Sequence, residues 1–232
     1  MDVYSQAAEV IERLHGLSGE IQLQRRGSDF EIIYNGVFLM ATYNGASEKK
    51  AVRDALLSFT CDGCSKLRVL MGGLGVGYSL QEALSFKEVG QVKIVEIEPA
   101  IIRWNRKYFK EINGEALDDR RSELIEGDFY RVLIEEANAA QQDQINKYHL
   151  VMVDTDNGSS WLSIPSNAAI YAEEGLMLIA DCLHSGGIAC FWVSRREEEF
   201  EHKLRKVFNI VRFQLVMEKT GQEGCYYLAR KE

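Results

Sequence analysis

The chain has 232 residues, of which 46% are hydrophobic, and it carries a formal net charge of −8 with a pI near 5.2. This length fits one α/β domain with a small appendage, and an acidic chain is a poor partner for nucleic acid. No apolar run approaches the roughly 18 residues of a membrane helix, and no signal peptide opens the sequence. We therefore expect a cytoplasmic protein without a membrane or nucleic-acid partner.

The beginning of the chain predicts a small unit over residues 1–46. Apolar residues at helical spacing predict a helix over residues 2–15, ended by Gly16 and Gly19. Three extended runs follow at residues 20–24, 30–34 and 37–43. Asn35-Gly36 between the last two predicts a tight hairpin. We expect this helix and β unit to lie beside a larger sheet.

Residues 47–232 predict a Rossmann-like domain. Ser47 is expected to cap a helix, and strands then alternate with helices from Leu67 onward. Five strands joined by helices end at a hairpin over residues 211–229, whose two strands should pair antiparallel. This pattern matches the seven-stranded, mostly parallel sheet of class I methyltransferases.

Glycines follow the first strand of this domain directly and precede a helix. Gly72, Gly73, Gly75 and Gly77 allow positive φ angles and a close approach of ligand to backbone. The helix N-terminus should offer free N–H groups. Because Tyr78 replaces the third glycine of the dinucleotide pattern, a smaller nucleoside such as S-adenosylmethionine is favoured over a dinucleotide.

Acidic residues follow three of the predicted parallel strands. They lie at the carboxyl ends of these strands, which is the edge where open α/β sheets bind ligands. Glu96 lies about 20 residues beyond the glycines, where a ribose diol usually binds. We expect Glu96 to bind the ribose hydroxyls and Ile97 to pack on the adenine. Asp128 should accept a hydrogen bond from the adenine amino group, and Asp154 should lie nearest the reactive sulfonium.

The cysteines predict reduced thiols and no metal. They are five in number, and three lie in apolar or strand-like contexts. Cys61-Asp-Gly-Cys64 has the spacing of a metal or redox motif but lacks a second pair. We interpret this segment as a plain loop.

The chain resembles the spermidine/spermine synthase (polyamine aminopropyltransferase) family over roughly residues 30–195. The matching stretches are GGLGVG, VEIEP, EGDFYRVL, YHLVMVDTDNGSSW, YAEEG and HSGGIACFWVS. The resemblance implies a methyltransferase-like fold and, as co-substrate, S-adenosylmethionine or its decarboxylated form. It also implies a small-molecule acceptor such as a polyamine, and a homodimer or larger oligomer.

The sequence departs from the family pattern at residues that bear on the reaction. Gly75 stands where the family has an aspartate that attracts the ammonium of the decarboxylated donor and would repel the carboxylate of S-adenosylmethionine. Asn157 stands where the family has the acid that receives the amine proton. Asp156 is therefore the candidate base, with Asp154 positioning the donor. The family's Tyr-His-Glu segment is replaced by residues 47–50, Ser-Glu-Lys-Lys.

We interpret the chain as an enzyme that transfers an alkyl group from a sulfonium nucleoside to an amine or other small nucleophile. The departures at Gly75 and Asn157 favour methyl transfer slightly. A true aminopropyltransferase and a non-catalytic nucleoside-binding module remain alternatives. Tyr43, Trp161 and Tyr171, together with Asn157, are the candidate lining of an acceptor pocket, since aromatic walls suit cationic or apolar acceptors.

Overall fold

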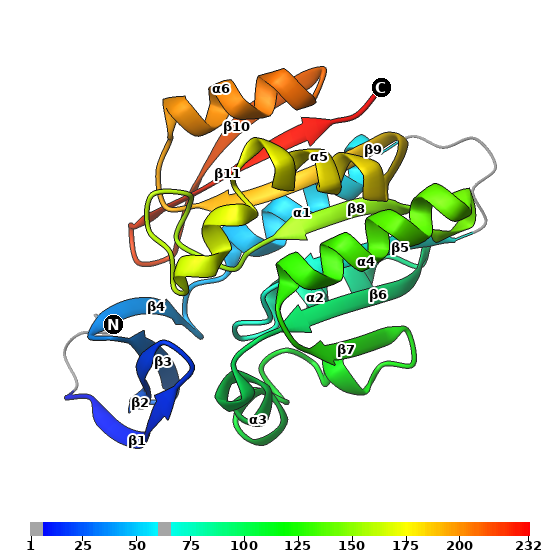
Figure 1. The fold of residues 1–232 in the computed structure, drawn as a ribbon. Helices are drawn as coiled ribbons and strands as arrows, with labels where there is room; N and C mark the ends of the chain where they lie inside the picture. Colours follow the sequence, from blue (N-terminus) through cyan, green and yellow to red (C-terminus); the bar gives the residue numbers. More distant parts are fainter. Residues whose placement is uncertain (1–6, 60–65) are drawn as a thin grey trace.

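The computed structural model describes residues 7–59 and 66–232, which form two sheets with helices around the larger one (Figure 1). The smaller sheet is antiparallel and contains four strands in sequence order. These strands are β1 (Glu9–Gly16), β2 (Gly19–Arg26), β3 (Asp29–Tyr34) and β4 (Val37–Ala41). The hairpin predicted at Asn35-Gly36 is confirmed, since both residues have positive φ and join β3 to β4.

The helix predicted over residues 2–15 is wrong where the structure describes this segment, because residues 9–16 form β1. The register between β1 and β2 shifts between Val10 and Glu12, which leaves Ile11 as an extra residue in a bulge. A bulge breaks the two-residue alternation of a strand. The apolar spacing at Val10, Ile11 and Leu14 therefore imitates a helical pattern.

The larger sheet contains seven strands in the order β10-β11-β9-β8-β5-β6-β7. Only β11 pairs antiparallel with its two neighbours, so the predicted mostly parallel sheet with a terminal hairpin is confirmed. The strands are β5 (Leu67–Gly72), β6 (Val89–Glu96), β7 (Ser122–Glu126), β8 (Tyr148–Val153), β9 (Leu183–Val193), β10 (Ile210–Met217) and β11 (Glu223–Arg230).

Helices cover both faces of this sheet, with α1 and α2 on one face and α4, α5 and α6 on the other (Figure 1). The α-helices are α1 (Ala46–Ser58), α2 (Tyr78–Ser85), α3 (Pro99–Lys107), α4 (Phe129–Gln142), α5 (Glu173–Cys182) and α6 (Glu198–Val207). Short 3-10 helices lie at η2 (Ala116–Asp118), η3 (Gln144–Asn146) and η4 (Pro165–Ala169). The long helix predicted over residues 167–183 is thus divided between η4 and α5, and β9 begins already at Leu183.

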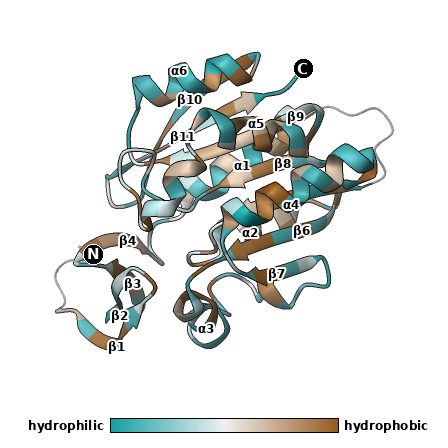
Figure 2. Cartoon of the chain, viewed as in Figure 1, coloured by the Kyte–Doolittle hydropathy of each residue, from teal (hydrophilic) through white to brown (hydrophobic). Residues whose placement is uncertain are grey.

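Two apolar cores fill the layers on either side of the sheet. One includes residues of α1, α2, α3 and the small sheet, and the other lies beneath α4, α5 and α6. Apolar residues accordingly concentrate along the central strands, whereas α6 turns a hydrophilic face outward (Figure 2).

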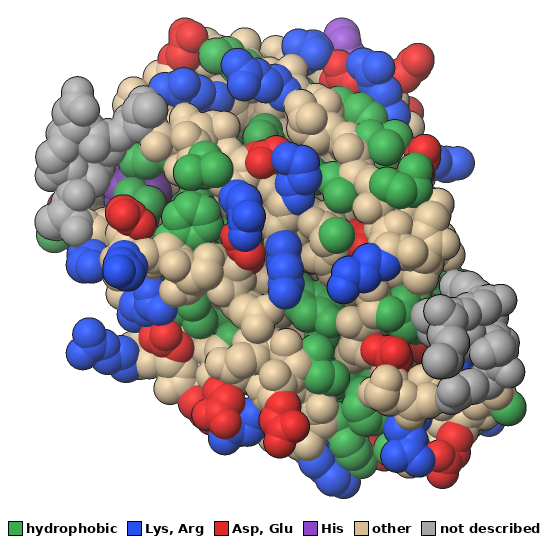
Figure 3. Space-filling model, turned by 180° about the vertical axis from the view of Figure 1, so that it is seen from behind, with side chains coloured by type: hydrophobic (Ala, Val, Ile, Leu, Met, Phe, Trp, Pro, Cys, Tyr) green, Lys and Arg blue, Asp and Glu red, His purple; other side chains and the backbone are tan. Residues whose placement is uncertain are grey.

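On the surface of the molecule opposite to the view of Figure 1, Lys and Arg side chains gather near the middle (Figure 3). Within residues 7–59 and 66–232, no helix combines the length and apolar character needed to span a membrane.

The N-terminus of α1 is fixed by the carboxylate of Glu218, which lies in the turn between β10 and β11. Glu218 accepts hydrogen bonds from the backbone N–H groups of Gly45 (3.1 Å), Ala46 (3.1 Å) and Ser47 (2.8 Å). Ser47 was expected to cap this helix, but its hydroxyl donates to Glu48 instead. Burial acts to raise the pKa of Glu218, yet the hydrogen bonds from residues 45–47 outweigh it and hold the pKa below its ordinary value.

We predict that Glu218→Gln lowers the free energy of unfolding by about 1–2 kcal/mol at neutral pH, because an anionic helix cap is lost. Since the pKa of Glu218 is lowered in the folded state, the wild-type advantage should vanish as the pH falls through the titration of this carboxyl. Urea unfolding at neutral and acidic pH measures both effects. Glu223→Gln, at an exposed position of the same hairpin, is the matched control. Equal stability of the two variants at neutral pH would contradict the assigned cap.

Candidate functional site

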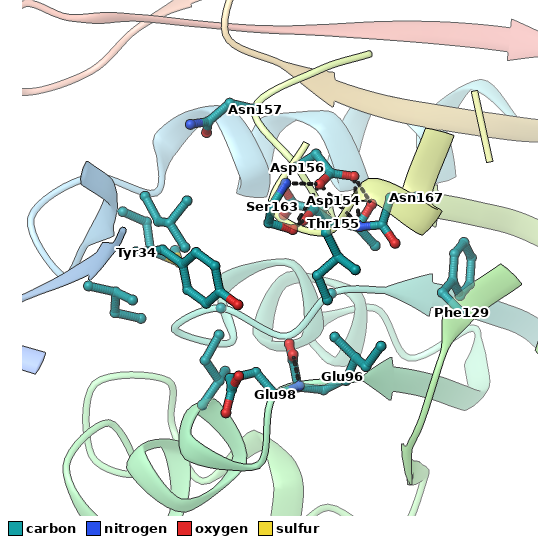
Figure 4. A pocket seen from close by; sticks show the side chains of 18 of the residues that line it. Tyr34, Glu96, Glu98, Phe129, Asp154, Thr155, Asp156, Asn157, Ser163 and Asn167 are labelled. Carbon is teal, nitrogen blue, oxygen red and sulfur yellow. Dashed lines mark hydrogen bonds between the residues drawn. The ribbon is translucent and has the colours of Figure 1, made fainter. Parts of the chain in front are cut away.

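A pocket opens at the edge formed by the carboxyl ends of the parallel strands, between that edge and the small sheet. It encloses about 960 Å³, counting the part open to solvent. Loops after β5, β6, β7 and β8 contribute to its walls, as do β3, β4 and the first turn of α1. The predicted position of the ligand site is therefore the position of a real cavity (Figure 4).

The glycine loop between β5 and α2 forms part of the floor, but most of its N–H groups are already bonded. Four of the five amides of residues 73–77 donate within the protein. Gly73 donates to Val95 O and Gly77 to Leu74 O, while Leu74 donates to the Glu96 carboxylate. Val76 donates to the sulfur of Met40 at 3.2 Å. The free N–H groups expected from the sequence are thus largely absent from this loop, which suits a nucleoside better than a phosphate.

Gly73 and Gly75 line the pocket, and both have positive φ. A Cβ on Gly73 would lie 2.1 Å from the Asp154 carbonyl oxygen, so the β5 and β8 loops require glycine there. A Cβ on Gly75 would lie 2.4 Å from the sulfur of Met40. Gly72 and Gly77 stand back from the pocket: Gly72 packs on Phe129, and Gly77 precedes α2.

Glu96 lines the pocket at the end of β6 and is 5% exposed. Its carboxylate accepts from the N–H groups of Leu74 (2.9 Å) and Glu98 (2.8 Å), and thereby joins the glycine loop to the β6–α3 loop. Burial and the charge of Glu98 raise its pKa. Ile97 also lines the pocket. Both residues therefore line the cavity, as their predicted contacts with the ribose and the adenine require.

Asp128, the residue predicted to bind the adenine amino group, is not among the residues that line the pocket. It caps α4 instead, with one carboxylate oxygen accepting from the N–H groups of Tyr130 (2.8 Å) and Arg131 (3.3 Å). Its chain neighbours Gly127 and Phe129 are the residues that line the pocket. The physical reason is that Asp128 begins a helix, and the cap directs the carboxylate onto the backbone. Its contribution to the pocket is to fix the position of Phe129.

Asp154 lines the pocket directly after β8, among several other carboxylates. Its one side-chain hydrogen bond within the described chain is a long one from Ser79 Oγ, at 3.4 Å. Burial, with the negative charges of Glu48, Glu96 and Asp156, raises the pKa of Asp154 to about 8. A carboxylate that is poorly hydrogen-bonded and surrounded by like charge will bind either a proton or a cation.

Asp156 is 6% exposed, and its carboxylate is bonded to the loop that follows it (Figure 4). It accepts from the hydroxyl of Thr155, from the N–H and hydroxyl of Ser163, and twice from the amide of Asn167, at 2.6–3.1 Å. These donors occupy both oxygens. The geometry therefore gives Asp156 the role of shaping residues 155–167, and it does not support the predicted role as base.

We predict that Asp156→Asn lowers the free energy of unfolding by roughly 1.5–3 kcal/mol, because an amide nitrogen would face groups that themselves donate. Urea unfolding measures the loss. Asp181→Asn, at an exposed position near the end of α5, is the matched control. Unchanged stability together with abolished activity would return Asp156 to the role of a base.

The predicted aromatic acceptor wall needs correction, since none of its three aromatic residues lines the pocket. The Tyr43 hydroxyl donates to Glu31 at 2.9 Å in the small sheet. Tyr171 is 3% exposed and packs edge-on against Phe200 beneath α6. Trp161 lies in the loop after β8 without reaching the cavity, whereas Asn157 does line it.

Other residues line the pocket that the sequence did not single out. Trp192 comes from the end of β9, Tyr34 from β3, and Glu48 from α1. The strand-edge rule that identified Glu96 and Asp154 also applies to Trp192, at the end of the fifth parallel strand. No local signal marks Tyr34 or Glu48, because the small sheet and α1 reach this edge only through tertiary packing.

No group of three or more His, Cys, Asp or Glu residues is arranged to hold a metal ion in the described part of the chain. Cys182, Cys190 and Cys225 are buried free thiols. The Cys61–Cys64 motif lies outside the described residues.

Comparison with known proteins identifies the family. The spermine/spermidine synthase domain family matches residues 60–229. The chain belongs to this family. A polyamine aminopropyltransferase of Prochlorococcus marinus (strain MIT 9215) is 24% identical over 167 residues, covering 68% of this chain and 56% of that protein. One from Sulfolobus acidocaldarius is 34% identical over 86 residues, covering 37% and 26% of the two chains.

Solved structures of the family share the fold. Spermidine synthase from Thermotoga maritima superimposes with a TM-score of 0.76 at 17% identity, covering 96% of this chain and 73% of that one. A spermidine synthase in complex with the transition-state analogue AdoDATO also gives 0.76, at 18% identity, with 96% and 72% covered. The chain spans about half the length of the Prochlorococcus marinus relative. None of these four relatives is named as a methyltransferase, so the methyl preference inferred from the sequence finds no support among them.

Proposed function

We propose that this protein transfers an aminopropyl group from decarboxylated S-adenosylmethionine to an amine of a small cationic acceptor of the polyamine class. The observation that carries the proposal is the crowding of Glu48, Glu96, Asp154 and Asp156 in one pocket. Family membership agrees with it. The alternative of methyl transfer requires a donor that carries a carboxylate, and like charges repel strongly in a largely buried pocket.

The donor's nucleoside would lie along the loops after β6 and β7. Glu96 would accept from the ribose hydroxyls, because each oxygen that already accepts one backbone N–H keeps a second lone pair. The adenine would pack between Ile97 and Phe129, both of which line this end of the pocket. In this arrangement the sulfonium would point toward Asp154, across the glycine loop.

The reaction is an in-line displacement at the carbon bonded to the sulfonium. The lone pair of a neutral amine forms the new carbon–nitrogen bond, and the carbon–sulfur bond breaks with its electrons staying on sulfur. Methylthioadenosine leaves, and the amine gives up one proton. Asp154 is the base we propose, because its carboxylate has a raised pKa and only one long hydrogen bond. Asp156, the base favoured by the sequence, is fully engaged by its loop.

The proposed donor is tested by offering both sulfonium nucleosides with a linear diamine. We predict at least tenfold tighter binding of the decarboxylated donor, equivalent to about 1.4 kcal/mol, because it adds a cation and lacks a carboxylate. Calorimetry measures the two affinities, and mass spectrometry identifies the nucleoside product. Methylthioadenosine is expected. Formation of adenosylhomocysteine would instead establish a methyltransferase, and binding without any product would indicate a non-catalytic module.

The proposed base is tested by the pH dependence of transfer. Asp154 must be deprotonated to act, and its pKa is raised to about 8, so kcat/KM should rise with pH and level off above about 8. Asp154→Asn should lower kcat by roughly 10²–10⁴-fold and remove this rise, while the affinity for methylthioadenosine stays within a few-fold. Asp181→Asn serves as the exposed control. An unaltered pH profile in Asp154→Asn would assign the titration to another group.

A further inference from the structure

A second cavity adjoins the first on the side away from the proposed nucleoside end. It encloses about 860 Å³, counting the part open to solvent. Its walls come from β4, from the first turn of α1, from the end of β9 and from the β10–β11 hairpin. Five residues line both cavities and so mark the passage between them: Leu39, Met40, Glu48, Asn157 and Trp192.

Glu48 is the acidic residue of this passage. It is 7% exposed, and it lies in the first turn of α1, where the helix N-terminus stabilises a negative charge. No Lys or Arg of the described chain forms an ion pair with it. A buried carboxylate without a cationic partner is costly, and its pKa is raised by burial and by the charge of Glu218. A bound cation would relieve that cost.

A chain of hydrogen bonds fixes the direction of the Glu48 carboxylate. The Trp192 indole N–H donates to Ser47 Oγ at 3.0 Å, and the Ser47 hydroxyl donates to Glu48 at 2.6 Å. Gly224 of β11 allows this arrangement, because a Cβ there would lie 2.5 Å from Ser47 Oγ. The terminal hairpin thus holds Ser47, through Gly224 and the cap formed by Glu218. These contacts indicate a carboxylate held ready for a ligand.

We infer that Glu48 binds an ammonium group of the acceptor in the passage between the two cavities and thereby selects acceptors with two or more amines. This inference rests on the proposed function. One amine would lie beside Asp154 as the nucleophile, and a second, charged amine would lie beside Glu48. Phe38, Leu39 and Trp192 provide apolar surface for the methylene groups beyond the passage. Trp192 would therefore contact the acceptor directly, and its hydrogen bond to Ser47 would also position Glu48.

The test compares a linear diamine with the alkyl monoamine of the same chain length. Wild-type protein should favour the diamine at least tenfold in kcat/KM, and Glu48→Gln should reduce this preference to within about twofold. The dissociation constant of methylthioadenosine should stay unchanged in the variant. Ser47→Ala should reduce the preference partly, and Glu199→Gln, on an α6 side chain that is 89% exposed, should leave it unaltered. A diamine preference retained by folded Glu48→Gln would overturn the inference.

Calorimetry of the two amines in the presence of methylthioadenosine keeps this test separate from the proposed reaction. If the wild type shows no turnover but binds the diamine at least tenfold more tightly than the monoamine, and Glu48→Gln loses this difference, the reaction is refuted while the assignment of Glu48 stands. Equal binding of both amines by the wild type would overturn the assignment of Glu48. If Glu48→Gln does not fold, the variants Ser47→Ala and Trp192→Phe test the inference instead. Each removes a hydrogen bond of the series that runs from Trp192 through Ser47 to Glu48. Unaltered selectivity for the diamine in both variants would refute the inference.

Discussion

Electrostatic repulsion among buried carboxylates is the constraint on which this site depends. Parallel strands deliver the ends of β6 and β8 to one edge, and Glu96 and Asp154 come with them. The first turn of α1 adds Glu48 from a different part of the chain. In a largely buried pocket such charges interact far more strongly than they would in water. The pKa of Asp154 is accordingly raised, and the cationic ligand proposed above would take the place of a proton in this pocket.

The glycine loop differs from a phosphate-binding loop because most of its backbone N–H groups are already hydrogen-bonded within the protein. Its amides are used to hold the loop, since Leu74 donates to Glu96 and Val76 donates to Met40. A phosphate would meet few free donors here and several carboxylates. A sulfonium nucleoside needs neither phosphate donors nor a positive surface, because its own charge is positive. The hydrogen bonds of the loop and the charge of the pocket thus both agree with the proposed sulfonium nucleoside.

The sequence predicted the large sheet well, because its strands are short apolar runs separated by helices of clear periodicity. It predicted the pocket edge for the same reason, and Gly73, Gly75, Glu96 and Asp154 all line the cavity. It failed where local pattern and tertiary geometry diverge. The bulge at Ile11 gives a strand the apolar spacing of a helix.

The roles of individual acids were harder to predict than their positions. An acidic residue after a strand can face a ligand or cap the next helix, and Asp128 does the second. Asp154 and Asp156 are two residues apart in the sequence, yet one has a single long side-chain hydrogen bond and the other has a full set. Only the placement of Ser163 and Asn167 distinguishes them. Sequence spacing does not contain that information.

Met40 and Glu48 bear on Gly75, the position at which the family pattern described above has an aspartate. Met40 reaches from β4 to within 3.2 Å of the Val76 amide, and its sulfur fills the space where a side chain on residue 75 would begin. An aspartate at position 75 would therefore require the flexible Met40 side chain to move, and it would also be strained by the positive φ of residue 75. Glu48 supplies a carboxylate to the same pocket from α1. In this chain a helix held in place by the terminal hairpin thus contributes negative charge to the pocket, and the glycine loop contributes none.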